Sequence, residues 1–227
     1  MKSFVKVVLV VVLMLSSSLK AKALFSDIKV HRGESTAILM VFDVIGLNSP
    51  LYPLFNKNLE QFKQDFNVRV FRALRVHNVQ IFMMANQVFP IVNISSKRVN
   101  NIIRKFPEAI HTLRVEANNI QTAADSKDIY STIEYINEIV DEEYQNYSNV
   151  IVVIASNFRN KVNNDFLKRQ KQISLSSKIT KMVIYASSGL QYTRKVYVSQ
   201  RIEAERNVRN FFKRRLPSNK IVWFDKY

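Results

Sequence analysis

The chain has 227 residues, no cysteine, and a formal net charge of +16 from 34 lysines and arginines against 18 aspartates and glutamates. The lack of cysteine excludes disulfides, thiolate metal sites, cysteine nucleophiles and a lipid anchor on an N-terminal cysteine. Only three glycines occur, which excludes the glycine-rich dinucleotide turn, the phosphate loop and the nucleophile elbow. The positive charge favours anionic partners: nucleic acid, lipid head groups, acidic glycans or an acidic protein.

Residues 1–23 have the pattern of a secretory signal peptide. Lys2 and Lys6 give a positively charged start before the apolar run Val7–Leu15, and residues 21–23, Ala-Lys-Ala, place small side chains where a signal peptidase cleaves. The apolar run spans about 13 Å as a helix, far less than the ~30 Å hydrocarbon core of a bilayer. We therefore expect cleavage after Ala23 and a periplasmic or secreted protein, with an uncleaved anchor as the alternative. A bacterial periplasm suits an exported chain without cysteine.

Residues 24–227 are predicted to form one domain. The length is sufficient for one domain with a sizeable hydrophobic core and too short for two domains of typical size. Removal of the four lysines of residues 1–23 leaves a net charge of +12 on this part.

Apolar runs typical of buried strands alternate with segments of helical periodicity. Phe55–Ala73 repeats apolar residues on one helical face, and Arg98–Phe106 is predicted as a short helix that ends before Pro107. Further helices are expected over 126–147, 162–173 and 194–216, and strands over 37–42, 79–84, 88–94, 150–155, 180–186 and 220–224.

This alternation predicts an α/β fold: a three-layer, doubly wound, mostly parallel sheet with one antiparallel edge hairpin at 79–94. Ligands of such folds bind beyond the carboxyl ends of the strands. Asp43, Ser156-Asn157 and Ser187-Ser188 stand at the ends of predicted strands. They are therefore the first candidates for a functional site.

Three segments resemble a von Willebrand factor A domain. ILMVFDVIGLNSP at 38–50 is similar to the family's first strand with its aspartate and serine-bearing loop. DSKDIYSTIEYI at 125–136 resembles the Gly-Gly-Thr-Asp segment with its helix, and NVIVVIASNF at 149–158 resembles the strand that ends in Ser-Asp-Gly. The resemblance covers nearly all of residues 24–227 and implies a von Willebrand factor A-like fold. In that family these segments hold Mg²⁺ through oxygen ligands, and a partner's carboxylate completes the metal-ion-dependent adhesion site.

The metal site that the resemblance implies is degenerate here. Asp43 keeps the first position, but Ile45 and Leu47 occupy the two serine positions, and Lys127 and Asn157 replace the threonine and the second aspartate. One carboxylate remains where a divalent cation needs several oxygen donors. We therefore expect no metal and no other cofactor.

Lys127 provides a hypothesis for what replaces the metal. Its ammonium group could occupy the cation's place and pair with Asp43, which would spare that carboxylate the cost of an unpaired buried charge. Alternatively, Lys127 lies at a helix start and points into solvent. Ser49 is a further oxygen donor, which could join a Mg²⁺ site only if its loop is rearranged.

FDVIGL at 42–47 also resembles the first motif of haloacid dehalogenase-like phosphatases. There the leading aspartate is the nucleophile and an acid two residues later handles the proton, but Ile45 occupies that second position. His31, His77 and His111 are isolated in sequence and form no recognisable metal or catalytic motif. An exported, Mg²⁺-dependent hydrolase centred on Asp43 is thus a second alternative, and we do not expect an enzyme.

The helix predicted near the carboxyl terminus carries a basic surface formed by Arg206, Arg209, Lys213, Arg214 and Arg215. Such a surface could hold an anionic polymer or an anionic membrane, or it could be a solvated helix face. Nucleic acid is not expected for an exported chain. The leading prediction is an exported, non-enzymatic binding protein that engages a protein partner in an envelope or secretion complex. Binding of an anionic polymer or membrane through the basic helix is the first alternative.

Overall fold

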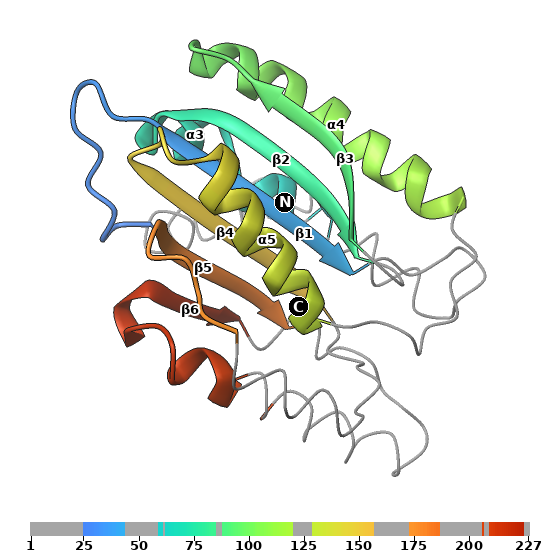
Figure 1. Ribbon diagram of the computed structural model, residues 1–227. Coiled ribbons are helices and arrows are strands. Elements are labelled where there is room, and N and C mark those ends of the chain that lie inside the picture. The colour runs from blue at the N-terminus through green and yellow to red at the C-terminus, as the bar shows by residue number, and fades with distance from the viewer. Residues whose placement is uncertain are drawn as a thin grey trace, which may run out of the picture.

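A six-stranded mixed sheet forms the centre of the computed structural model (Figure 1). The structure describes residues 25–43, 59–60, 62–84, 88–119, 129–156, 173–186, 206 and 209–224. The strands are β1 (Thr36–Asp43), β2 (Val76–Met84), β3 (Val88–Ser95), β4 (Asn149–Ser156), β5 (Ile179–Ala186) and β6 (Ile221–Phe224). Their order is β3-β2-β1-β4-β5-β6, and β2 and β3 are antiparallel while the other neighbours are parallel. The predicted α/β class and the mostly parallel sheet with one antiparallel hairpin are confirmed.

The two central strands are apolar on both faces, as strands of a covered parallel sheet must be. All eight residues of β1 and all eight of β4 are buried. Their parallel register aligns Ile38 with Ile151 and Phe42 with Ala155. The β1–β4 pair therefore joins chain segments more than a hundred residues apart at the middle of the sheet.

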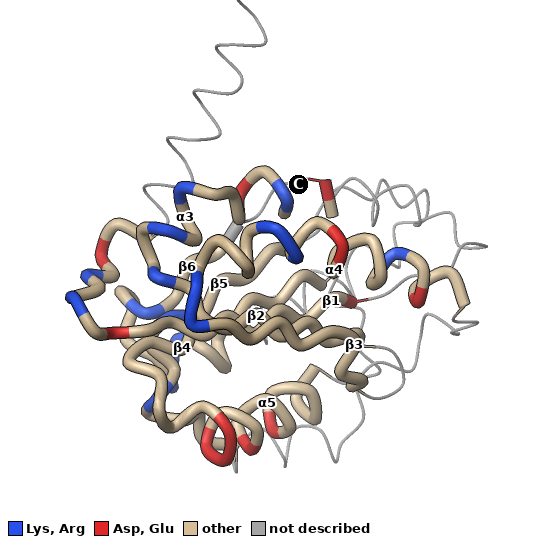
Figure 2. Tube along the Cα trace, turned by 90° about the horizontal axis from the view of Figure 1, so that it is seen from above, with Lys and Arg blue, Asp and Glu red and all other residues tan. Residues whose placement is uncertain are grey.

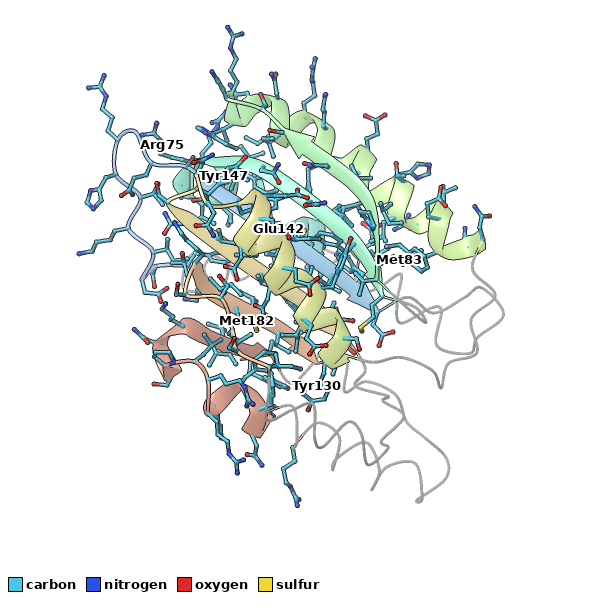
Figure 3. The ribbon with its side chains drawn as sticks, viewed as in Figure 1. Arg75, Met83, Tyr130, Glu142, Tyr147 and Met182 are labelled. Atoms are coloured by element: carbon cyan, nitrogen blue, oxygen red, sulfur yellow. The ribbon has the colours of Figure 1, made fainter. Side chains whose placement is uncertain are left out.

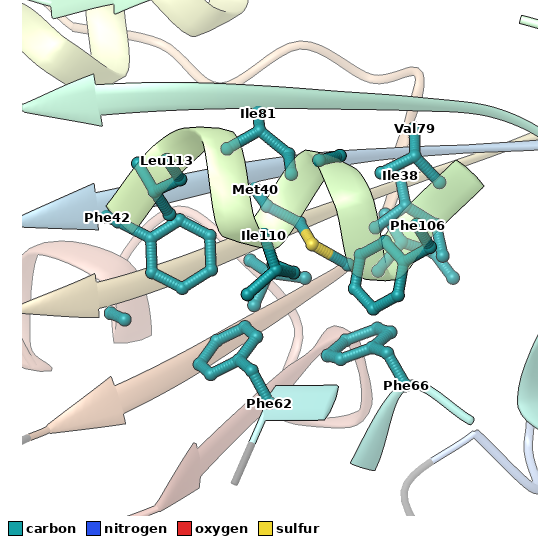
Figure 4. Close-up of a cluster of buried hydrophobic side chains, with 14 of the residues drawn as sticks. Ile38, Met40, Phe42, Phe62, Phe66, Val79, Ile81, Phe106, Ile110 and Leu113 are labelled. Carbon is teal, nitrogen blue, oxygen red and sulfur yellow. The ribbon is translucent and has the colours of Figure 1, made fainter. Parts of the chain in front are cut away.

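Side chains of β1 alternate between two buried clusters. Met40 and Phe42 belong to the cluster that contains residues of α3 (Val68–Ala73) and α4 (Val99–Asn119), whereas Leu39 and Val41 belong to the cluster with α5 (Ile129–Glu143). Figure 2 shows α3 and α4 on one side of the sheet and α5 on the other. The first cluster is rich in aromatic rings, with the Phe62 centroid 4.7 Å from that of Phe42 (Figure 4).

The helix predicted over 55–73 is interrupted in the structure. Helical residues extend to Asp65, and α3 begins anew after Asn67, whose side-chain oxygen accepts hydrogen bonds from the backbone N–H groups of Arg69 (3.0 Å) and Val70 (3.3 Å). Asparagine is a strong N-cap because its short amide satisfies these otherwise unbonded donors. The apolar spacing continues across the break, so the periodicity of the sequence gives no sign of it. Residues 55–58 lie outside the described residues.

The prediction that a helix ends before Pro107 is wrong. α4 runs for 21 residues with Pro107 in its interior, although an interior proline removes one backbone hydrogen bond and costs about 3 kcal/mol. The helix continues because one face stays buried on both sides of the proline, from Phe106 to Ile110 and Leu113. The Phe106 ring packs edge-on against Phe71 of α3 at 4.9 Å. Tertiary packing thus overrides the local helix-ending signal.

Two other predicted helices fall wholly or largely outside the described residues. Residues 157–172 and 187–205 are not described, and the basic helix is seen only at Arg206 and over 209–213. α5 ends at Glu143, four residues earlier than predicted, and its predicted start at 126–128 is also not described. No helix in the described part of the chain combines the length and the apolarity needed to cross a bilayer.

A buried polar network joins the end of α5 to the sheet. The Tyr144 hydroxyl lies 3.2 Å from Oδ1 of Asn78 and also contacts Oε1 of Gln80, and Asn78 donates to Oδ1 of Asn93 at 2.9 Å. Burial raises the pKa of Tyr144, and the neighbouring Glu143 and Tyr147 raise it further, so the hydroxyl remains a donor. This network satisfies the polar positions that interrupt the apolar face of β2.

Residues 25–27 also pack on the sheet. The ring of Phe25 lies 5.6 Å from that of Phe66, and the buried ammonium of Lys181 on β5 pairs with Asp27. A buried lysine is costly without a partner, so this contact ties the segment after the predicted cleavage site to the core.

We predict that Asn67→Ala destabilises the fold by about 1 kcal/mol, because the mutation leaves two backbone donors at the start of α3 without their acceptor. Urea unfolding followed by circular dichroism measures the change. The matched control is Asn146→Ala, at an exposed turn residue, which should leave the free energy of unfolding nearly unchanged. Equal stability of the two variants would show that the cap contributes nothing.

Candidate functional site

Asp43 and Ser156 meet at the carboxyl ends of the two central strands. Asp43 is the last residue of β1 and Ser156 the last of β4, and the serine hydroxyl donates to Oδ2 of the aspartate at 2.9 Å. Both side chains lie on the α5 face, since they continue the alternation of Leu39 and Val41 on β1 and of Ile154 on β4. We call this pair the Asp43–Ser156 site.

The site lies where the order of the strands reverses. From β1 the chain proceeds outward to β2 and β3 on one side, and then returns to place β4, β5 and β6 on the other. The connections leave β1 and β4 in opposite directions, which opens a crevice beyond their carboxyl ends in folds of this kind. The strand order therefore marks this edge, and this pair of strands, as the position where a ligand is expected.

The pair presents a hydrogen-bond acceptor, the Asp43 carboxylate, whose orientation Ser156 fixes. Asp43 is 6% exposed and Ser156 is 4% exposed, so water provides little solvation for the carboxylate. The hydrogen bond from Ser156 fixes the orientation of the carboxylate and uses one of its several acceptor positions. A carboxylate oriented in this way suits an ammonium, a guanidinium or an N–H donor.

A second buried carboxylate lies on the opposite face of the sheet. Asp65, which is 5% exposed, accepts a hydrogen bond at 3.1 Å from the hydroxyl of Tyr185 near the carboxyl end of β5. The Tyr185 ring packs on Phe62 at a centroid distance of 4.4 Å. Sequence reasoning did not identify this pair, although Asp65 follows Phe62 by three residues and therefore shares its helical face.

The described residues contain only part of the predicted site. Asp43 occupies the predicted position, and Ser156 joins it, as its place at a strand end indicated. Ser49, Lys127 and Asn157 lie outside the described residues, so the predicted pairing of Lys127 with Asp43 remains a prediction. Ile45, Leu47 and Ser187-Ser188 also lie outside them. The described residues contain no cluster of three or more histidine or acidic side chains placed to hold a metal.

The predicted basic surface divides into two groups. Arg206, Lys213 and Arg214 are exposed. The guanidinium of Arg209 instead lies 4.1 Å from the ring centroid of Trp223. That of Arg215 lies 4.1 Å from Phe211 and donates from Nε to the carbonyl of Ile173 at 2.7 Å. Burial lowers the pKa of Arg215, consistent with its internal contacts. Arg209 thus joins the helix to β6, and Arg215 joins it to the segment that begins at Ile173.

Comparison with known proteins assigns no family to this geometry. No protein-family model matches the chain, and no curated protein matches it. The candidate site therefore rests on the arrangement of its own residues.

We predict that Ser156→Ala destabilises the protein by about 1.5–3 kcal/mol, because it removes a hydrogen bond to a buried charged group. Chemical unfolding followed by circular dichroism measures the change. Ser95→Ala, at an exposed position of β3, is the control, and an equal effect in that variant would argue against a special role for Ser156.

Proposed function

We propose that this chain is an exported, non-enzymatic binding protein that engages a protein partner at the carboxyl edge of its sheet. The observation that carries the proposal is the hydrogen-bonded Asp43–Ser156 pair at the point where the strand order reverses. Export is supported by the pattern of residues 1–23, which leads to a periplasmic or secreted location after cleavage near Ala23.

The scaffold we propose is a three-layer, von Willebrand factor A-like domain. The strand order, the antiparallel edge strand and the helices on the two faces support this assignment. In the resemblance described above, Asp43 takes the place of the family's first aspartate and Ser156 that of the strand-ending serine. The two positions are neighbours here, which the resemblance requires.

Recognition at this site is proposed to be direct rather than bridged by a metal ion. Isoleucine, leucine, lysine and asparagine replace four of the family's oxygen ligands, whereas the first carboxylate is kept and fixed by Ser156. A positively charged group then takes the place of the cation, supplied either by Lys127 or by the partner. The remaining contacts come from the surface around the site, as in ordinary protein interfaces.

We expect Asp43→Asn to weaken partner binding by about 10–100-fold, because it removes the charge from a hydrogen-bonded carboxylate while nearly preserving its shape. The chain, immobilised through its carboxyl terminus, is incubated with an envelope extract of the source cells, and retained proteins are quantified. The control is Glu142→Gln, an exposed acid on α5. A protein that wild type and control retain equally, and that Asp43→Asn loses, supports the proposal. An unchanged set of retained proteins, with melting temperatures that show all variants folded, would refute it.

We also expect no rise in melting temperature when Mg²⁺, Mn²⁺ or Ca²⁺ is added to millimolar concentration. A ligand that binds only the folded state raises stability once its concentration exceeds its dissociation constant. A rise that Asp43→Asn abolishes would contradict the direct mode of recognition. It would indicate a rebuilt metal site and direct attention to bridged adhesion or to metal-dependent hydrolysis.

A further inference from the structure

Positive charge is concentrated at the amino edge of the sheet, opposite the Asp43–Ser156 site. Segments 28–35, 67–77 and 96–100 contain a single acidic residue, Glu34. We define the basic edge as six of their cations: Lys29, Arg32, Arg72, Arg75, Lys97 and Arg98. Figure 2 shows these segments at one end of the sheet, and Figure 3 labels Arg75 there, with Met83 at the opposite end.

Three contacts draw the segments of the basic edge together. The Arg75 side chain donates to the backbone carbonyl of His31 at 3.4 Å, and Arg72 donates to Oδ1 of Asn100 at 3.4 Å. The backbone N–H of Ser96 donates to the carbonyl of His77 at 2.9 Å. The cations therefore form one surface, although they are far apart in the sequence.

The charges of the basic edge face solvent. Five of its side chains are exposed and Arg75 is half-buried. None of the six belongs to a salt bridge formed within the described part of the chain. Nearby, burial lowers the pKa of His77 and the charge of Arg75 lowers it further, as expected beside accumulated positive charge. The acidic end of α5 also lies toward the amino ends of the strands, since Tyr144, which follows it, contacts Asn78 near the start of β2, but it is on the opposite face of the sheet from α3 (Figure 2).

The backbone at Arg75 is unusual for its position. Arg75 follows the C-cap of α3 with φ of 50°, the left-handed conformation that disfavours residues with a Cβ and is usually given to glycine at this point of a helix end. A cation thus stands where glycine would be the more stable choice. Strained backbone of this kind is concentrated at functional sites of proteins.

We propose that the basic edge docks the protein on an anionic lipid surface. Val68, 43% exposed at the start of α3, adds an apolar side chain beside the cations, which is the combination that interfacial binding uses. Phe71, the only phenylalanine, tyrosine or tryptophan in these segments, is 1% exposed and offers no ring for stacking on bases. Lipid phosphates are therefore favoured over single-stranded nucleic acid. The surface lies at the opposite edge from the Asp43–Ser156 site and does not depend on the function proposed there.

The test compares the full chain with two triple variants in co-sedimentation with vesicles of phosphatidylglycerol and phosphatidylcholine. K29Q/K97Q/R98Q removes three exposed cations of the basic edge, and R206Q/K213Q/R214Q removes three exposed cations elsewhere. Each cation near an anionic bilayer contributes roughly a fivefold gain in binding, so the first variant should lose about 100-fold. The second should stay within about threefold of wild type, because its charges lie away from the contact and are screened. Vesicles of phosphatidylcholine alone measure the contribution of the apolar run Val7–Leu15, which all three proteins share.

Arg75→Gly separates binding from folding. We expect this variant to raise the melting temperature by about 2–4 °C, because relief of the left-handed backbone outweighs the loss of the long, exposed hydrogen bond to His31. It should bind anionic vesicles about fivefold more weakly, because it removes a cation. A destabilised protein cannot explain that combination. Equal losses in the two triple variants would overturn the proposal, since they would reduce the effect to net charge. The proposal also fails if K29Q/K97Q/R98Q binds anionic vesicles as tightly as wild type. It fails as well if the protein binds duplex DNA through the basic edge and does not bind anionic vesicles.

Discussion

The parallel pairing of β1 with β4 is the constraint on which the rest of the structure depends. It joins two strands that are buried on both faces, and it places the second half of the sheet on the opposite side of β1 from the first. Because the strands are parallel, their last residues fall at the same edge, and Asp43 meets Ser156 there. The same pairing sets the two clusters, one with α3 and α4 and one with α5, that exclude water from both sides of the sheet.

Polar side chains are buried in this interior where another side chain of the protein forms a hydrogen bond or an ion pair with them. Ser156 holds Asp43, Tyr185 holds Asp65, and Asp27 holds the ammonium of Lys181, while Tyr144 joins the amides of β2. Each arrangement reduces the cost of taking a polar or charged group out of water. Two buried carboxylates lie near the carboxyl ends of the strands, and the cations of the basic edge lie at the amino ends. The parallel arrangement of the strands keeps those ends apart.

The two proposals describe one orientation of the molecule. With the basic edge on anionic lipid, the Asp43–Ser156 site at the other end of the sheet points away from the membrane and toward a protein partner. The acidic last turn of α5 lies on the opposite face of the sheet from α3 (Figure 2). A domain held in this way would present the same recognition edge in every copy, as a component of an envelope complex requires.

The sequence by itself determined the fold class, the strands and the candidate position of Asp43. A buried parallel strand appears in the sequence as an unbroken apolar run, and the polar residue that follows the run marks the end of the strand. The sequence could not determine which strand ends meet, since the hydrogen bond between Asp43 and Ser156 depends on a pairing across more than a hundred residues. Local signals failed where packing or capping competed with them: α4 continues through Pro107 because its buried face continues, and Asn67 starts a new helix within one apolar stripe. The basic edge likewise arises only in three dimensions, because its cations come from separate segments that hydrogen bonds bring together at the amino ends of the strands.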